Sequence, residues 1–215
     1  QIPTYEALKG IAASIYWKPT ITWVIDAVRV KNQIQTETRG VCQMKYNERA
    51  EDKKRDLSYY TYLKGCQYQV RAHFVWNENR PELAQDRNEN KHHNIAKRML
   101  ERGGRRDIFL GTRECQGYVA PCVFGEGVGH YDDVAELAFG LMYHGLTYPD
   151  EAYSPETKDH MTVRFWYPVM RNGVVEFLPP EQCTVVRTVR EMEAKPFGQD
   201  CGNFIGLEEF PEEVD

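Results

Sequence analysis

The stretch Cys66-Gln-Tyr-Gln-Val-Arg-Ala-His-Phe-Val-Trp76 carries an apolar side chain at every second position. Alternation with a period of two is typical of a strand that buries one of its faces. We therefore predict a strand here, with the side chains of Tyr68, Phe74 and Trp76 turned towards a core. Upstream, Ile21–Val30 is rich in β-branched residues and begins with apolar residues on both faces, which indicates a central strand.

Helices are expected on either side of these two strands in the sequence. Thr4 is a suitable N-cap for a first helix, whose apolar residues recur at helical spacing until Pro19 forces an end. After a turn at Arg80-Pro81, a second helix is expected to begin near Asp86 and to stop at Gly103-Gly104.

A short strand at Asp107–Leu110 completes the order α-β-β-α-β in the first half of the chain. One leading strand would extend this order to β-α-β-β-α-β, the ferredoxin-like unit. Because the sequence opens on Gln1, almost at the start of the first helix, we expect the domain to lack that first strand here.

The second half is dominated by predicted strands, whereas residues 31–58 look polar and irregular, with a charged loop at 51–56. Asn172-Gly173 predicts a type I′ hairpin, and Gly125–Gly129 predicts a turn. The expected strands are Tyr118–Phe124, Leu137–Tyr148, Val163–Met170 and Val174–Phe177.

These elements predict an α+β chain in three parts. Residues 1–113 would form a ferredoxin-like (RAMP/RRM-like) domain, residues 114–190 a small antiparallel β-sheet domain, and residues 191–215 an acidic tail. A hydrophobic content of 41% argues against disorder, and no apolar run is long enough to span a membrane. The six cysteines include no closely spaced pair, so we expect reduced thiols in a cytoplasmic protein, with no metal site and no cofactor. The four tryptophans, Trp17, Trp23, Trp76 and Trp166, are expected in the core.

Charge is distributed unevenly along a chain whose formal net charge is −5. Residues 191–215 hold eight acidic residues and one lysine. The segment from Arg87 to Arg106 contains seven Lys and Arg residues but only two Glu residues, and Lys91 and His92 are adjacent near its start. A basic helix surface in an acidic protein suggests that a polyanion is bound there, although a solvated helix face explains the same pattern.

Several motifs resemble the CRISPR-associated Cas5 family, in its type I-C (Dvulg) branch. The resemblance rests on Pro3-Thr-Tyr-Glu-Ala-Leu-Lys-Gly-Ile-Ala-Ala-Ser-Ile-Tyr16-Trp-Lys-Pro19, on Tyr59–Leu63, on Phe74–Asn77, on Asp86-Arg87 with Lys91-His92, and above all on Gly103-Gly-Arg-Arg-Asp-Ile-Phe-Leu-Gly-Thr-Arg-Glu-Cys115. It extends from Pro3 to about Met192.

This resemblance implies a metal-independent endoribonuclease that cuts the repeat RNA of the CRISPR precursor transcript. It also implies that the protein then stays on the 5′ handle of the mature guide RNA, with the backbone and large subunits of the type I-C interference complex. The catalytic residues of the family correspond to Tyr16, Lys91 and His92. His93, Lys97, Arg98, Arg105 and Arg106 are expected to contact RNA.

The chemistry of these side chains suits RNA cleavage. The attacking group is the RNA's own 2′-hydroxyl, so the enzyme must orient it, move protons and stabilise the phosphorane. His92 suits proton transfer near neutral pH, Lys91 would stabilise the phosphorane charge, and Tyr16 would orient the nucleophile or a phosphate oxygen. The products would be a 2′,3′-cyclic phosphate and a 5′-hydroxyl.

Two other functions are compatible with the sequence. One is a scaffold that binds the guide's 5′ handle without cutting it, for which the combination of Tyr16, Lys91 and His92 would be unnecessary. The other is a ferredoxin-like protein that binds or cleaves DNA, for which Mg²⁺ dependence would be expected.

Overall fold

The computed structural model describes residues 2–42 and 57–194, and within them the chain is α+β. All strand pairs in these residues are antiparallel. No helix in these ranges combines the length and the apolar character needed to cross a membrane.

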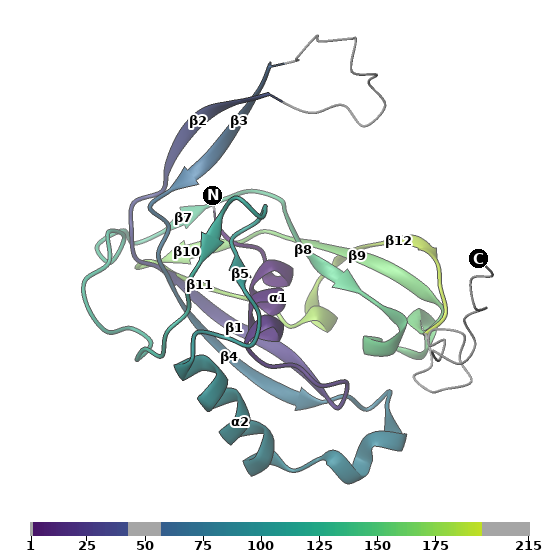
Figure 1. The fold of residues 1–215 in the computed structure, drawn as a ribbon. Coiled ribbons are helices and arrows are strands. Elements are labelled where there is room, and N and C mark those ends of the chain that lie inside the picture. Colours follow the sequence, from purple (N-terminus) through teal and green to yellow (C-terminus); the bar gives the residue numbers. More distant parts are fainter. Residues whose placement is uncertain (1, 43–56, 195–215) are drawn as a thin grey trace, which may run out of the picture.

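The main sheet has five strands in the order β4-β1-β11-β10-β7 (Figure 1). Its central strands join distant parts of the chain, because β1 pairs on one side with β4 and on the other with β11. The predicted strand at Ile21–Val30 is confirmed as β1, and the alternating stretch is confirmed as β4. The main sheet therefore contains strands from both sides of the domain boundary expected between residues 113 and 114. The strands are β1 (Ile21–Val30), β4 (Tyr68–Trp76), β7 (Leu137–Ala138), β10 (Val169–Arg171) and β11 (Val174–Glu176).

Helix α1 (Tyr5–Ile15) packs on this sheet and also contacts β8 of the second sheet (Figure 1). Its N-cap is Thr4, as predicted, whose hydroxyl accepts a hydrogen bond from Ala7 N at 3.2 Å. The buried face of α1 meets a core from β1, β10 and β11, and each fully buried aliphatic side chain contributes about 1.5–3 kcal/mol. This core comprises Tyr5, Leu8, Ala12, Ile25, Val28, Val30, Met170 and Val175, among others.

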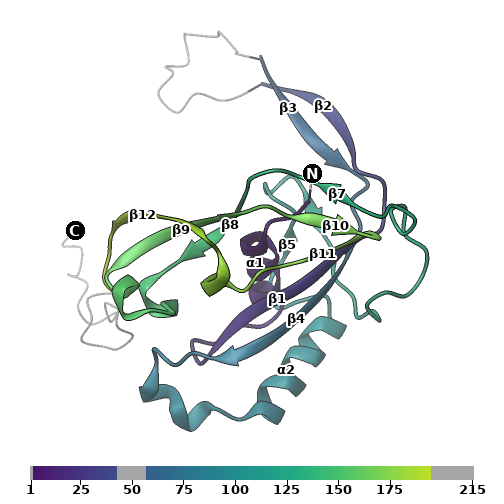
Figure 2. The same ribbon diagram turned by 180° about the vertical axis from the view of Figure 1, so that it is seen from behind.

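Helix α2 (Glu89–Glu101) follows the short 3-10 helix η1 (Pro81–Asp86), as the sequence predicts. The side chain of Asn88 caps α2 by accepting a hydrogen bond from Lys91 N at 3.0 Å. The helix ends at two glycines with positive φ, Gly103 at 87° and Gly104 at 107°. The amide of Gly104 closes the end by donating to Met99 O at 2.8 Å, and α2 lies beside β4 (Figures 1 and 2).

The second sheet has three strands in the order β12-β9-β8, and α1 lies against its inner face. A buried polar network stands on that face. The Arg164 guanidinium donates to His144 Nδ1 at 3.4 Å and also to the Thr147 hydroxyl, while His144 Nε2 contacts Leu178 O at 2.9 Å. Burial, with a smaller contribution from the nearby Arg164 charge, lowers the pKa of His144 to about 4. The elements are β8 (Met142–Thr147), η2 (Pro149–Glu151), η3 (Pro155–Thr157), β9 (His160–Trp166), η4 (Pro180–Gln182) and β12 (Val185–Glu191).

The predicted type I′ hairpin connects β10 and β11. Asn172 and Gly173 both have positive φ, at 49° and 78°, which is the backbone that this turn requires. The predicted turn at Gly125–Gly129 is held by Arg29, a buried side chain of β1. The Arg29 guanidinium donates to Gly127 O at 2.8 Å, to Glu126 O at 3.2 Å and to the Asp132 carboxylate at 2.7 Å.

The described part of residues 31–58 is more regular than predicted. β2 (Gln35–Cys42) and β3 (Leu57–Lys64) form a two-stranded ribbon that projects from the body (Figures 1 and 2). The expectation of an irregular segment is wrong for 35–42, because cross-strand pairing with β3 overrides a polar composition. The charged loop expected at 51–56 lies outside the described residues, as do residues 195–215 of the expected acidic tail.

Three further strand predictions need correction. Tyr118–Phe124 is not a strand, since Pro121 offers no amide and Tyr118 is 88% exposed, with no sheet to cover it. Leu137–Tyr148 is split into β7 and β8, with Gly140 at a φ of 74° between them. Val163–Met170 is divided at Pro168 between the two sheets.

The predicted strand at Asp107–Leu110 is reduced to β5 (Ile108–Phe109). It pairs with β6 (Gln116–Gly117) in a separate two-stranded ribbon, and not with the main sheet as a ferredoxin-like order would require.

Candidate active site

Tyr16 and His92, which lie 76 residues apart, meet in a buried contact between the end of α1 and the first turn of α2. The Tyr16 hydroxyl is 2.8 Å from His92 Nδ1, and the exposed fractions of the two residues are 3% and 0%. Tyr16 adopts extended backbone angles immediately after α1, so its side chain leaves the helix towards α2. The structure thus brings two of the three predicted catalytic residues into direct contact.

The hydrogen bonds of His92 identify which ring nitrogen carries the proton. His92 Nε2 lies 2.8 Å from the backbone carbonyl oxygen of Asp86, and a carbonyl can only accept. In neutral His92, Nε2 is therefore the donor and Nδ1 is the acceptor. The Tyr16 hydroxyl then donates to Nδ1, an arrangement in which His92 is positioned to receive the phenolic proton.

The aromatic face of β4 encloses His92. Phe74 and Trp76 pack with their rings roughly edge-on to the imidazole, at centroid distances of 6.3 and 5.6 Å. The alternation that predicts β4 from the sequence thus also supplies the wall of this site. Burial raises the pKa of the Tyr16 phenol, and the nearby Asp86 carboxylate raises it further, so Tyr16 is neutral at physiological pH.

Asp86, the last residue of η1, connects the site to Lys91. Its carboxylate accepts hydrogen bonds from Lys91 Nζ at 2.5 Å and from the Thr20 hydroxyl at 2.8 Å, and it lies 3.5 Å from His92 Nε2. The Lys91 hydrogen bond is the main reason that the pKa of Asp86 is lowered, and the same bond raises the pKa of Lys91. The Lys91 side chain is half exposed, and its raised pKa keeps the ammonium protonated at neutral pH. A positive charge therefore lies at the surface beside the buried Tyr16–His92 pair.

Sequence reasoning did not assign roles to Asp86 and Thr20. The available signal for Asp86 was its place at the end of the turn before α2, where its carboxylate can reach the first helical turn. Thr20 gave no such signal, because its partner lies 66 residues away.

The five predicted RNA-contacting residues all have exposed side chains: His93, Lys97, Arg98, Arg105 and Arg106. The backbone amides of Arg105 and Arg106 both donate to Ser14 O at 3.1 Å, which ties the end of α2 to α1. Arg105 is close enough to Tyr16 for its charge to oppose the rise in the phenol's pKa. Lys91, Arg105 and the exposed face of α2 thus give the surface around the buried pair a positive character.

Comparison with known protein families gives one match. A family model described as CRISPR-associated protein (Cas_Cas5) matches residues 1–178. A solved structure described as a CRISPR-associated protein is 38% identical, with a TM-score of 0.72 over 87% of this chain and 85% of that one. The functionally uncharacterised protein SMU1763c from Streptococcus mutans is 42% identical, with a TM-score of 0.70 over 87% and 86%. No curated protein matches significantly.

Proposed function

This chain belongs to the CRISPR-associated Cas5 family, and on that premise we propose that it is a metal-independent endoribonuclease of CRISPR repeat RNA. The observation that supports the proposal is the 2.8 Å contact between Tyr16 and His92, beside the Asp86–Lys91 ion pair. Family membership itself associates the chain with CRISPR RNA and with other Cas subunits.

The proposed reaction uses His92 through Tyr16. His92 has no exposed surface, so it acts as a positioning residue and proton acceptor. Lys91 is half exposed and faces the RNA, whereas Tyr16 is only 3% exposed and would have to be uncovered by RNA binding to meet the 2′-oxygen. As the 2′-oxygen attacks the adjacent phosphorus, its proton passes to the Tyr16 oxygen and the phenolic proton passes to His92 Nδ1. The Asp86 carboxylate stabilises the imidazolium that results, as a carboxylate does in hydrolase triads.

Lys91 would stabilise the negative charge that develops on the phosphorane oxygens. The P–O5′ bond then breaks and the leaving 5′-oxygen takes a proton from solvent. The products are a 2′,3′-cyclic phosphate and a 5′-hydroxyl.

A second candidate function is a non-catalytic scaffold that holds the 5′ handle of the guide RNA. The observation that favours it is the complete burial of His92, both of whose ring nitrogens already have protein partners. In such a scaffold the Tyr16–His92 contact would only fix α1 against α2.

Cleavage of a labelled hairpin repeat RNA in EDTA separates the two candidates. Wild-type protein should cut it, and a 2′-deoxy substitution at the cut site should abolish cutting. His92→Ala should lower the rate by about 10²–10⁴-fold, whereas His130→Ala, at an exposed histidine with no assigned role in the site, should leave the rate within a few-fold. Tight binding without cleavage by wild type would favour the scaffold, and cleavage of a DNA substrate that requires Mg²⁺ would favour a DNA-directed nuclease.

We further propose that the mature guide RNA stays bound by its 5′ handle, alongside the backbone and large subunits of the type I-C complex. Lys97, Arg98 and Arg106 would contact phosphates, so neutralising one of them should reduce the slope of log K against log salt by about 0.7–0.9. Co-elution of the cleaved 5′-handle RNA with wild-type protein would support retention, and immediate release of both products would contradict it.

A further inference from the structure

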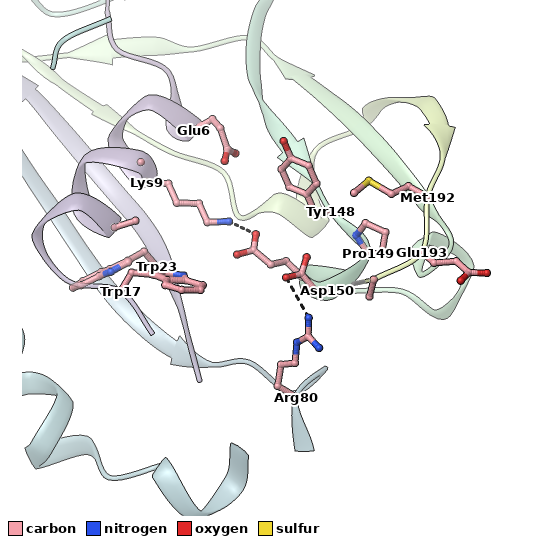
Figure 3. A pocket seen from close by; sticks show the side chains of 14 residues that line it. Glu6, Lys9, Trp17, Trp23, Arg80, Tyr148, Pro149, Asp150, Met192 and Glu193 are labelled. Carbon is pink, nitrogen blue, oxygen red and sulfur yellow. Dashed lines mark hydrogen bonds and ion pairs between the residues drawn. The ribbon is translucent and has the colours of Figure 1, made fainter. Parts of the chain in front are cut away.

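A cavity in the described structure is lined by Trp17, the neighbour of Tyr16 in the sequence, and plays no part in the mechanism above. It has a volume of about 390 Å³, within the range of about 300–1,000 Å³ that is usual for small-ligand pockets. Figure 3 shows side chains reaching it from α1, from the start of β1, from η2 and from the end of β12.

Two indoles form one wall of this pocket. Trp23 packs against the core as expected, whereas Trp17 corrects the expectation that every tryptophan lies in the core. Trp17 follows Tyr16 directly in the sequence and is 37% exposed. The Trp23 indole N–H donates to the carbonyl oxygen of Tyr16 at 2.7 Å. The pocket wall is thus joined to the backbone of Tyr16, so a ligand that moves the Trp23 indole would act on the segment that carries Tyr16.

The charges that line the pocket disfavour a phosphate group. Carboxylates outnumber cations there, and both cations are already close to carboxylates: Lys9 is paired with Glu151, and Arg80 lies 3.8 Å from Asp150 (Figure 3). Aromatic walls combined with acceptor oxygens suit the uncharged part of a nucleotide, its base.

Glu6 is the acceptor best placed to select among bases. One oxygen of its carboxylate accepts a hydrogen bond from Leu146 N at 3.3 Å, and within the described residues the other oxygen has no hydrogen-bond partner. Burial raises the pKa of Glu6, so the carboxylate is poorly solvated and would gain from a further donor. Guanine alone among the four bases presents an imino and an amino donor side by side, which together match a carboxylate.

We propose that this pocket is a base-binding subsite, in which a guanine of the bound RNA stacks on Trp17 and donates hydrogen bonds to Glu6. The inference rests on the proposed RNA-cleaving function, since it concerns the same substrate. It gives the protein a means of selecting its cleavage position that is separate from phosphate contacts, which carry no sequence information.

Gly10 provides a way to close the pocket without disturbing the fold. It lies on α1 and lines the cavity, and a Cβ placed on it would meet no atom within 4 Å. A leucine at this position would fill space at the pocket and would also favour the helix over glycine. Gly10→Leu should therefore fold at least as stably as wild type while excluding a base.

The test measures binding of labelled hexaribonucleotides by fluorescence anisotropy, comparing hexauridylate with the same hexamer carrying one central guanine. Wild type should bind the guanine hexamer at least about fivefold more tightly. Gly10→Leu and Glu6→Gln should remove this preference, and Trp17→Ala should weaken binding of both hexamers about tenfold, because stacking is tolerant of base identity. Tyr167→Ala, at an aromatic residue that is 67% exposed outside the pocket, is the matched control and should change neither.

Equal binding of the two hexamers by wild type, or a guanine preference that survives both Gly10→Leu and Glu6→Gln, would overturn the inference. Repeat-RNA cleavage by the same proteins distinguishes this failure from failure of the proposed function. If Gly10→Leu cuts repeat RNA at the wild-type rate and position, the subsite is wrong and the nuclease stands. If wild type prefers guanine but cuts nothing, the nuclease is wrong and the subsite stands.

Discussion

Replacing Tyr16 by phenylalanine removes one hydroxyl from a fully packed contact and has two separable consequences. The first is on stability, because His92 Nδ1 would be left as a buried acceptor with no donor. Leaving such a group unsatisfied costs about 1–3 kcal/mol. For a chain of this size, a loss of about 2 kcal/mol lowers the melting temperature by about 4–8 °C.

The second consequence is on catalysis. Native domains have a free energy of unfolding of about 5–15 kcal/mol, so Tyr16→Phe should remain about 99% folded at 25 °C even at the lower end of that range. A fall in the rate of repeat-RNA cleavage by about 10²–10⁴-fold would then report the loss of the proton path, and not the loss of folded protein. Urea denaturation and single-turnover cleavage at 25 °C measure the two effects on the same preparation.

Tyr167→Phe is the control, because this exposed hydroxyl has no buried partner and its loss should cost less than about 0.5 kcal/mol. A Tyr16→Phe variant that is destabilised as expected but cleaves at the wild-type rate would refute the proton path through Tyr16. A variant with unchanged stability would show that the Tyr16–His92 hydrogen bond contributes nothing.

Three further predictions concern pH and the polar contacts that hold the fold. The pKa of His144 is about 4 in the folded protein and near 6.5 in the unfolded protein, so between these pH values only the unfolded state binds a proton at this histidine. The free energy of unfolding should therefore fall by roughly 3 kcal/mol as pH drops from about 6.5 to 4. Urea titrations should show a flatter pH dependence for His144→Gln. Removing one partner of a buried ion pair costs about 3–5 kcal/mol, and Arg29→Met should lie near the lower end, at about 3 kcal/mol, because Asp132 is partly exposed; an unchanged urea midpoint would contradict this. Because the pKa of Asp86 is lowered in the folded protein, its interaction with Lys91 stabilises the fold above the unfolded pKa of about 3.9. This stabilisation is lost as the pH falls through the pKa that Asp86 has in the folded protein. Thermal melts of Asp86→Asn should lack this acid-dependent loss.

Local sequence patterns predicted the elements that carry the site, and tertiary pairing decided the rest. The alternation of β4, the N-cap at Thr4 and the paired glycines after α2 are local signals, and all three are confirmed. The sequence of β2 gave no local signal, because this strand is stabilised by pairing with β3. The pairing of β5 was predicted wrongly, because the sequence of a two-residue strand does not determine which strand it pairs with.

The site could be predicted only in part for a related reason. Resemblance supplied Tyr16, Lys91 and His92 as residue types, but periodicity contains no information on which atoms meet across 76 residues. The donor and acceptor roles within His92 depend on the Asp86 carbonyl, a backbone atom that is invisible to any motif.

The position of β1 between β4 and β11 has a consequence for synthesis of the chain. A ribosome releases about 5–20 residues each second, so β4 is available to β1 within seconds, whereas β11, about a hundred residues later, follows after a further delay of about 5–20 s. During that delay β1, six of whose ten residues are buried in the folded protein, has an open edge, the kind of surface through which nascent chains associate. Slowed translation between residues 76 and 174 should therefore lower the yield of soluble protein, and a holdase chaperone should restore it.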